Sequence, residues 1–272
     1  MRNGLKSKVI VITGASSGIG AAMALRYAQM GAKVVLAARS ENRLKSLVRE
    51  IVSSGGQATY CVTDVTNAED CRALIDAAVR RFCRIDVLIC NAGISMRALF
   101  DDVELSVLHQ VMDVNFWGTV YCAKFALPYL QRYKGSLVGI SSVAGLHGLP
   151  ARTGYSASKY AMMGLLEAIR VENLKYGMHV MVACPGFTAT NIRYSALVAD
   201  GSQQGASPRD EDVMMSADDV ARIVADGICH RKRVCLMDAS GRATRLIKLF
   251  WPAFLDKIFY QLMAKEPNSP LN

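Results

Sequence analysis

The sequence predicts an α/β fold, a single doubly wound Rossmann-type domain built around a parallel sheet. Apolar runs rich in β-branched residues alternate with amphipathic stretches of helical length, which is the order that builds a parallel sheet with crossover helices. Some of the runs, such as residues 9–12 and 87–90, are apolar without alternation. Helices are therefore expected to cover both faces of the sheet.

Six strands are expected, each a short apolar run bounded by polar or turn-forming residues. They cover residues 8–13, 33–38, 57–62, 85–90, 135–141 and 179–184. The 272 residues, 51% of them hydrophobic, are enough to bury one substantial core. The rhythm ends near residue 188, and the domain is expected to reach residue 241.

The turn after the first strand reads TGASSGIG at residues 13–20, and a helix-forming AAMAL follows it. Glycines at such a turn let the backbone approach a pyrophosphate, whose charge meets N–H groups at the positive end of the helix. The spacing is G-x-x-x-G-x-G rather than the usual G-x-G-x-x-G. Its place in the first strand–helix unit predicts nucleotide binding.

Arg39 ends the second strand, where an NAD site usually has an acidic residue for the ribose 2′-hydroxyl. A guanidinium can bind a 2′-phosphate through charge-assisted hydrogen bonds, whereas a carboxylate would repel it. The sequence therefore predicts NADP(H) over NAD(H). The alternative is an exposed arginine at a strand end, partly neutralised by Glu41.

Residues 188–216 interrupt the rhythm with Gly201, Gly205 and Pro208. A segment of this length inside a compact domain is usually a lid or a binding loop, and its place after a late strand predicts a substrate lid. Ser216 then reads as the N-cap of a helix with acidic residues in its first turn.

The stretch GYSASKYA places Tyr155 and Lys159 four residues apart, on one face of a helix. Of the ten tyrosines, only Tyr155 has a lysine four positions later. The pair is a candidate for acid–base catalysis, and a packing accident is the alternative.

Residues 242–272 are expected to form a helical extension with a broad apolar face. Two adjoining rows recur every four residues: Leu246, Phe250, Phe254, Ile258 and Leu262, then Ile247, Trp251, Leu255, Phe259 and Met263. Pro252 is expected to start a second helix or introduce a kink. Three interpretations stay open: docking onto the domain or a dimer partner, lining a hydrophobic pocket, or peripheral contact with a membrane surface.

Composition excludes several classes of protein. The net charge of +9 comes from dispersed basic residues without interleaved aromatics, so we expect no nucleic-acid binding. The eight cysteines and four histidines form no ligand or disulfide spacing, so we expect no metal. The polar start MRNGLKSK lacks the apolar core of a signal peptide, which predicts a cytoplasmic protein. The alternative is a protein that is peripheral at a membrane surface through its C-terminal helix.

Motifs in the first 190 residues or so resemble those of the short-chain dehydrogenase/reductase family. They are TGASSGIG at 13–20, Asp64 and Val65, NAG at 91–93, Asn115, the serines at 141 and 142, YSASK at 155–159, and Pro185 with Gly186. Their order matches that of the family. Within it, the lid residues Thr190–Asn191–Ile192 and ADGS at 199–202 resemble the branch of 11β-hydroxysteroid dehydrogenases and seven-B type dehydrogenase/reductases.

The resemblance implies roles for four residues. Tyr155 would be the catalytic acid/base, Lys159 its partner, Ser142 a hydrogen-bond donor to the substrate oxygen, and Asn115 the organiser of a proton relay. A tyrosine has an ordinary pKa near 10, and a nearby ammonium favours the phenolate. We therefore expect Lys159 to lower the pKa of Tyr155.

The glycine turn, Arg39 and the resemblance together predict the residues that contact the cofactor. These are Gly14, Ser16, Ser17, Gly18, Ile19, Gly20, Arg39, Asp64, Val65, Asn91, Ala92, Gly93, Tyr155, Lys159, Pro185, Gly186 and Thr188.

The expected function is NADP(H)-dependent hydride transfer to or from a lipophilic ketone or secondary alcohol, such as a steroid or a long-chain 3-oxo lipid. The alternative is a catalytically silent NADP(H)-binding sensor or assembly subunit. The resemblance also implies a homo-oligomer, a dimer or a tetramer.

Overall fold

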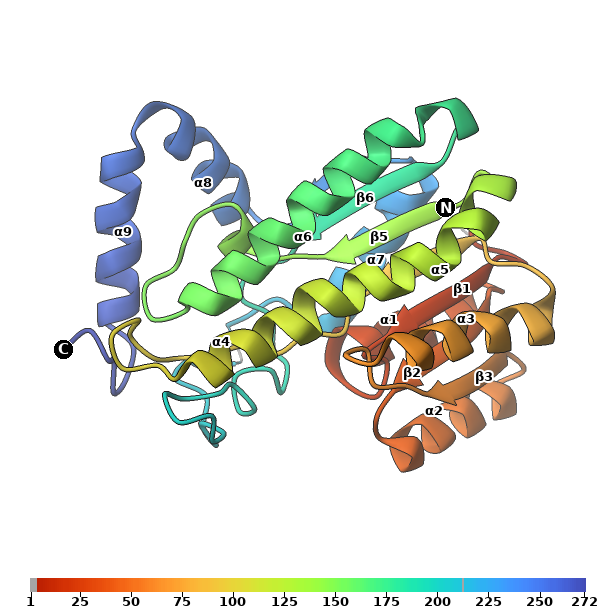
Figure 1. Ribbon diagram of the computed structural model, residues 1–272, viewed down its shortest axis with the longest axis horizontal. Helices are drawn as coiled ribbons and strands as arrows, with labels where there is room; N and C mark the ends of the chain where they lie inside the picture. Colours follow the sequence, from red (N-terminus) through yellow and green to blue (C-terminus); the bar gives the residue numbers. More distant parts are fainter. Residues whose placement is uncertain (1–3, 212) are drawn as a thin grey trace.

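The computed structural model describes residues 4–211 and 213–272. Residues 1–3, in the predicted domain, and residue 212, in the predicted lid, lie outside the described residues. The described chain forms one α/β domain around a central sheet, with two helices standing at the carboxyl ends of the strands (Figure 1). The predicted fold class is confirmed.

A seven-stranded parallel sheet in the order β3-β2-β1-β4-β5-β6-β7 forms the centre of the domain. Its strands are β1 (Val9–Thr13), β2 (Lys33–Ala38), β3 (Gln57–Val62), β4 (Val87–Cys90), β5 (Ser136–Ile140), β6 (His179–Cys184) and β7 (Val234–Leu236). All six predicted strands are present, and β4 begins two residues later than predicted. The sequence analysis missed β7, which has only three residues.

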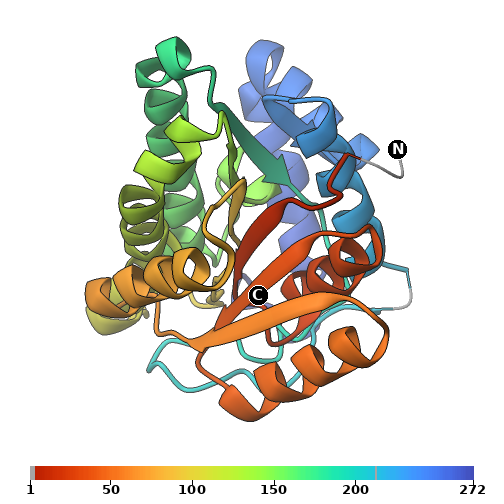
Figure 2. The same cartoon turned by 90° about the vertical axis from the view of Figure 1, so that its right-hand side faces the viewer.

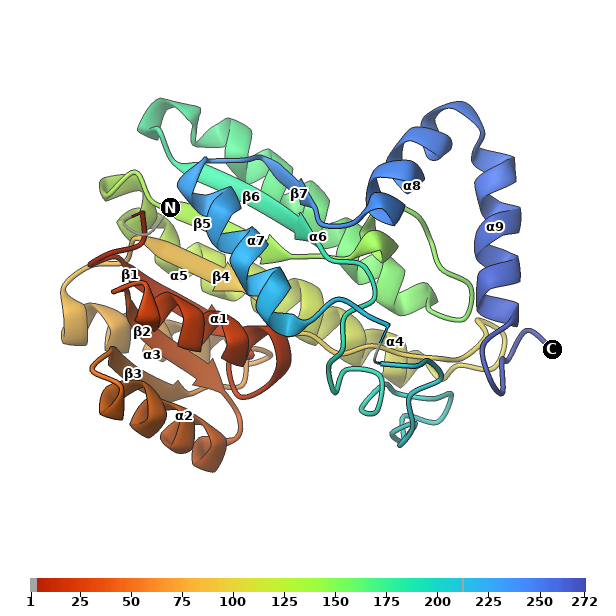
Figure 3. The same ribbon diagram turned by 180° about the vertical axis from the view of Figure 1, so that it is seen from behind.

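Helices cover both faces of the sheet, as Figure 2 shows. They are α1 (Gly18–Gln29), α2 (Glu41–Ser53), α3 (Ala68–Phe82), α4 (Leu105–Met112), α5 (Gly118–Arg132), α6 (Thr153–Glu172) and α7 (Ala217–Cys229). Helices α1, α2 and α7 lie on one face (Figure 3). Ile10 and Ile12 pack in the core on that side, whereas Val9 and Val11 pack in the core with residues of α3, α5 and α6. Because successive side chains of a strand point to opposite faces, a continuously apolar strand fills both cores.

The predicted lid has little regular structure, but it is tied to the domain. Isolated bridges join Thr188 to Met215 and Leu197 to Met96. The lid ends at Ser216, whose hydroxyl accepts a hydrogen bond from the Asp219 N–H at 3.0 Å. The predicted N-cap of α7 is therefore confirmed.

Two C-terminal helices, α8 (Ala239–Phe250) and α9 (Pro252–Ala264), follow β7. Pro252 starts the second helix, as predicted, because its missing N–H costs nothing at the first helical position. The division into a domain to residue 241 and an extension stays a prediction. Of the helices in the described residues, none has the length and apolar character needed to cross a membrane.

The two apolar rows of the extension have different surroundings. In the second row, Leu255, Phe259 and Met263 are buried against the domain. In the first row, Phe250 is 64% exposed, and Leu249, which lies beside this row, is 72% exposed. Docking onto the domain is thus observed for the part of the second row that lies in α9, whereas Trp251 of that row and most of the first row face outward.

Candidate active site

A cleft of about 930 Å³ opens at the carboxyl ends of the strands. This is where parallel α/β sheets bind their ligands. All predicted site residues line the cleft except Gly20 and Asn115, which lie behind its wall. The loops that carry the predicted motifs therefore converge on one site.

Hydrogen bonds between the loops after β1 and β4 build the glycine-rich wall of the cleft. The Asn91 side-chain amide donates to the carbonyl oxygens of Thr13 at 2.9 Å and Gly14 at 3.2 Å. The Thr13 hydroxyl accepts from the N–H groups of Asn91 and Ala92, both at 3.0 Å. Asn91 thus holds the turn rather than only facing a ligand.

Two glycines of the turn are required by its geometry. Gly14 has a φ of +64°, and a Cβ there would lie 2.8 Å from the Ala92 Cα. A Cβ on Gly20 would collide with the Gly14 carbonyl oxygen. Gly20 therefore allows α1 to begin directly beneath the turn, which explains why it does not line the cleft.

The first turn of α1 is open to an anion. Within the described chain, the Ser17 side chain makes no capping hydrogen bond, and no acidic residue lies in the first turn of the helix. The unsatisfied N–H groups and the positive end of the helix dipole favour a phosphate at this position.

Two arginines line the cleft beyond the end of β2. Arg39 and Arg43 are both exposed at its rim. The Glu41 carboxylate instead contacts Lys45 at 2.9 Å and the Tyr60 hydroxyl at 3.2 Å. Sequence reasoning missed Arg43, although its position four residues after Arg39 could have suggested it.

Asp64 and Val65 form the next part of the wall, after β3. The Asp64 carboxylate accepts hydrogen bonds from the N–H and the hydroxyl of Thr66, at 3.0 Å and 2.8 Å. Val65 is buried beneath it. Asp64 therefore shapes its own turn while it borders the cleft.

Tyr155 lies in the first turn of α6, and Lys159 follows one turn later on the same face. The Lys159 Nζ lies 5.6 Å from the centroid of the Tyr155 ring and donates a hydrogen bond to the Ile140 carbonyl oxygen at 2.9 Å. Ser142 faces them from the end of β5, and its hydroxyl also accepts from the Ala144 N–H at 3.2 Å. The candidate acid, its partner and the candidate donor thus meet at one end of the cleft.

Asn115 is fully buried in a π-helical turn, η1 (Asp113–Trp117). Its side chain accepts from the Ile94 N–H at 2.8 Å and donates to the Ile94 carbonyl at 3.0 Å and the Ser158 hydroxyl at 2.9 Å. Ser158 donates in turn to the Tyr155 carbonyl at 2.7 Å. Asn115 therefore links the loop after β4 to the turn that carries Tyr155, and sequence reasoning missed Ser158 as the connecting residue.

The pKa expectation for Tyr155 was wrong. Burial raises the pKa of Tyr155, and the effects that oppose burial come from Ser142, Arg152 and Arg193. Burial also lowers the pKa of Lys159 to about 8. Desolvation of the phenol therefore outweighs the Ser142 hydrogen bond and the arginine charges, which favour the phenolate.

The lid and the segment before α6 form the far end of the cleft. Leu149, Arg152, Phe187, Ile192 and Arg193 line it there. None of them was a predicted site residue, although Ile192 and Arg193 lie in the predicted lid. Within the part of the chain that the structure describes, α8 and α9 contribute no residue to the lining.

The extension supports this end of the cleft from outside. Leu255 and Phe259 of α9 pack against Val143 and Leu149, and Tyr155 packs at the edge of the same cluster. The extension therefore backs the wall of the cleft without lining it.

Comparisons with known proteins agree with this geometry. The family model described as short chain dehydrogenase matches residues 8–198. The chain is 34% identical to dehydrogenase/reductase SDR family member 7B of Danio rerio over 271 residues, which cover 97% of this chain and 86% of that protein. It is also 34% identical to 11-beta-hydroxysteroid dehydrogenase A of Sesamum indicum over 272 residues, 97% of this chain and 77% of that protein.

A solved structure of a short chain dehydrogenase/reductase from Burkholderia phymatum, in complex with NAD, has a similar fold. The TM-score is 0.81 at 27% sequence identity, over 92% of this chain and 96% of that chain.

Proposed function

The chain belongs to the short-chain dehydrogenase family of oxidoreductases, and on that premise we propose that it is an NADP(H)-dependent enzyme acting on a lipophilic ketone or secondary alcohol. It works as a carbonyl reductase or, in reverse, as an alcohol dehydrogenase. A steroid or a long-chain 3-oxo lipid has the required chemistry. One of the similar proteins is named a hydroxysteroid dehydrogenase, which supports this substrate class.

One observation carries the proposal: Ser142, Tyr155 and Lys159 line the same cleft as the glycine turn. A phosphate cradle alone would fit a binding protein. A phenol, a hydroxyl and a buried ammonium at the other end of the same cleft supply the groups that a carbonyl reduction needs.

The cleft fits a nicotinamide dinucleotide. The open first turn of α1 suits its pyrophosphate, and the guanidinium groups of Arg39 and Arg43 suit a 2′-phosphate. When bound, the cofactor supplies or accepts the hydride. Because the Burkholderia phymatum structure contains NAD, the preference for NADP(H) rests on these two arginines.

In the reductive direction, Tyr155 donates a proton to the carbonyl oxygen and Ser142 donates a hydrogen bond to the same oxygen. The raised pKa of Tyr155 keeps it protonated at neutral pH, which suits an acid. In the reverse direction Tyr155 must act as a base, and the positive charges of Arg152 and Arg193 favour its deprotonation. Asn115 and Ser158 hold the turn of α6 that aims the phenol.

The exposed apolar row of the extension supports a proposal about partners. Leu246, Phe250 and Phe254 of this row, with the neighbouring Leu249, would contact either a second copy of the chain, in a dimer or tetramer, or a membrane surface. Light scattering and flotation with anionic vesicles separate the two, with the Leu249→Glu variant compared in both. A monomer that stays in solution in both measurements would contradict the proposal.

The experiment that tests the proposed function is oxidation of NADPH and of NADH against a panel of steroid, retinoid, sphingoid and fatty ketones. We expect turnover of at least one lipophilic ketone, with NADPH preferred. Cofactor binding without turnover of any ketone would favour a silent nucleotide-binding protein instead.

A further inference from the structure

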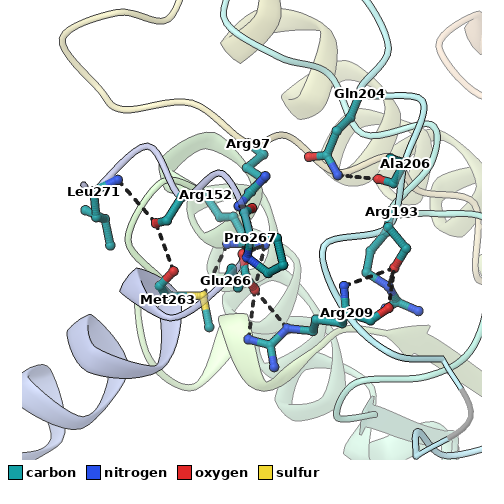
Figure 4. A network of polar contacts seen from close by, with 12 residues as sticks. Arg97, Arg152, Arg193, Gln204, Ala206, Arg209, Met263, Glu266, Pro267 and Leu271 are labelled. Atoms are coloured by element: carbon teal, nitrogen blue, oxygen red, sulfur yellow. Dashed lines mark hydrogen bonds and ion pairs between the residues drawn. The ribbon is translucent and has the colours of Figure 1, made fainter.

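Four arginines gather beside the far end of the cleft: Arg97, Arg152, Arg193 and Arg209 (Figure 4). We call them the arginine cluster. They come from the loop after β4, the residue before α6 and the lid. Ion pairs join three of them to the buried Glu266, at 3.4 Å for Arg97 and 2.8 Å for Arg152 and Arg209.

In the ion pairs of the arginine cluster, the positive groups of the described residues outnumber the negative groups. Arg193 pairs with Glu211 at 2.7 Å, so these ion pairs of the described residues join four guanidinium groups to two carboxylates. The Glu266 side chain is only 3% exposed. Burial and the charges of neighbouring arginines lower the pKa values of Arg97 and Arg209. A buried excess of positive charge is costly unless an anion matches it.

Two members of the cluster belong to the wall of the candidate active site. Arg152 and Arg193 line the cleft together with Tyr155, and the positive charge of each lowers the pKa of the Tyr155 hydroxyl. On Arg152, Nη2 bonds to Glu266, whereas Nη1 donates to the Met263 sulfur at 3.2 Å. A thioether is a weak acceptor, so this nitrogen has capacity for a stronger one.

The surface around these arginines is apolar. Leu149, Phe187 and Ile192 line the same end of the cleft. The Arg209 guanidinium lies 3.7 Å from the centroid of the Phe187 ring, so the cluster and the apolar wall are in direct contact. A ligand that fits here needs both an apolar body and a negative charge.

We propose that the substrate is an amphiphile, an apolar carbonyl compound with a carboxylate or phosphate group that Arg152 and Arg193 bind. This inference rests on the proposed oxidoreductase function and narrows its substrate class. Arg39 and Arg43 lie beyond β2, on the other side of β1 from the lid. The cleft thus has one cationic end for the cofactor and a second for the substrate.

The test compares matched substrates. The 4-, 5- and 6-oxo isomers of decanoic acid are assayed with NADPH beside their methyl esters, so that the ketone position varies while only the charge differs within each pair. We expect kcat/KM to be about tenfold higher for the acid of at least one pair, as for one charge-assisted hydrogen bond. Acids and esters that react equally at every position would overturn the proposal.

Two variants test whether Arg193 causes the difference between the acids and the esters. In Arg193→Gln, the acid-to-ester ratio of kcat/KM should fall toward one. The matched control, Arg222→Gln, removes the same charge from the exposed surface of α7 and should keep the wild-type ratio. A raised KM for NADPH with an unchanged ratio in Arg193→Gln would assign Arg193 to the cofactor and overturn the proposal.

A binding measurement separates this inference from the proposed function. Calorimetry on the protein saturated with NADPH compares decyl phosphate and decanoate with decanol. We expect either anion to bind at least tenfold more tightly than the alcohol, and equal affinities would overturn the inference. If the anions bind but no ketone is turned over, the anion site stands and the oxidoreductase proposal fails.

Discussion

The two ends of the cleft are built in different ways. The end proposed to bind the cofactor consists of the short loops after β1, β2 and β3 and the start of the loop after β4. It is held by backbone and side-chain bonds such as those of Asn91 to the glycine turn. The substrate end consists of the long lid, the segment before α6 and the supporting C-terminal extension. There, the ion pair between Arg152 and Glu266 joins residues 114 positions apart.

The difference explains what each end can do. Local loops on a rigid sheet fix one geometry, which suits a ligand that does not vary. An irregular lid held by side-chain ion pairs can change with little effect on the sheet. We therefore expect changes at one end to leave the other end largely intact.

Tyr155→Phe should have the largest effect, because Tyr155 is the proposed proton donor. The change removes one hydroxyl and little packing. We expect kcat/KM to fall by about 10² to 10⁴-fold, the usual range for a general acid, while the affinity for NADPH changes only a few-fold. Steady-state kinetics and fluorescence titration measure the two quantities, and turnover within a few-fold of wild type would refute the assigned role.

Glu266→Gln should perturb the substrate end alone. It leaves Arg97, Arg152 and Arg209 without their shared carboxylate, and breaking a buried ion pair costs about 3 to 5 kcal/mol of unfolding free energy. Urea unfolding measures this loss. Asp219→Asn, which breaks an exposed pair with Arg222, is the control and should cost less than about 1 kcal/mol.

The kinetic signature of Glu266→Gln is equally specific. We expect a higher KM for the ketone and an unchanged KM for NADPH, because the ion pairs of Glu266 hold the lid and not the glycine turn. A change in the KM for NADPH alone would contradict the separation of the two ends.

Lys159→Met tests the cost of burying the ammonium. Below pH 8, Lys159 is charged in the folded and unfolded states, so the folded protein bears the full cost of burial. From about pH 8 to 10.5 the folded lysine loses its proton before the unfolded one does, and wild type gains stability as pH rises. The unfolding free energy of the methionine variant minus that of wild type should therefore decrease over this range by about 3 kcal/mol. Thermal or urea unfolding at several pH values will measure this difference. A difference that is independent of pH would contradict the lowered pKa.

Arg39→Asp should have the smallest effect and should perturb only the cofactor end. The loss of a charge-assisted bond and the new repulsion of a 2′-phosphate shift the preference from NADPH toward NADH by about tenfold or more. Arg49→Asp, a change of the same charge on the exposed part of α2, is the control. An unchanged ratio of kcat/KM for the two cofactors would mean that residues other than Arg39 determine the preference for NADPH.

The cofactor end could be predicted from the sequence because its signals are local. Gly14 follows β1 directly and Gly18 begins α1, and a glycine at a positive φ has few substitutes. The strands were predicted because continuous apolar runs can only be buried on both faces. The strand β7 was missed because three residues carry no periodicity.

The substrate end could not be predicted because its contacts join distant segments. Nothing near Glu266 in the sequence indicates that it meets Arg97 and Arg209, and nothing near Arg193 places it beside Tyr155. The pKa of Tyr155 was mispredicted for a related reason. The sequence gives the distance to Lys159 along the helix, but the desolvation of the phenol depends on Leu149, α9 and the other elements packed around it.

The most direct measurement is a crystal structure of the chain with NADP⁺ and an unreactive analogue of a ketone substrate. We predict that the Tyr155 and Ser142 hydroxyls both lie about 3 Å from the analogue's oxygen, with the nicotinamide on the other side of the carbon that bears it. A bound dinucleotide whose nicotinamide lies away from Tyr155, with the phenol facing the protein interior, would contradict the proposed chemistry.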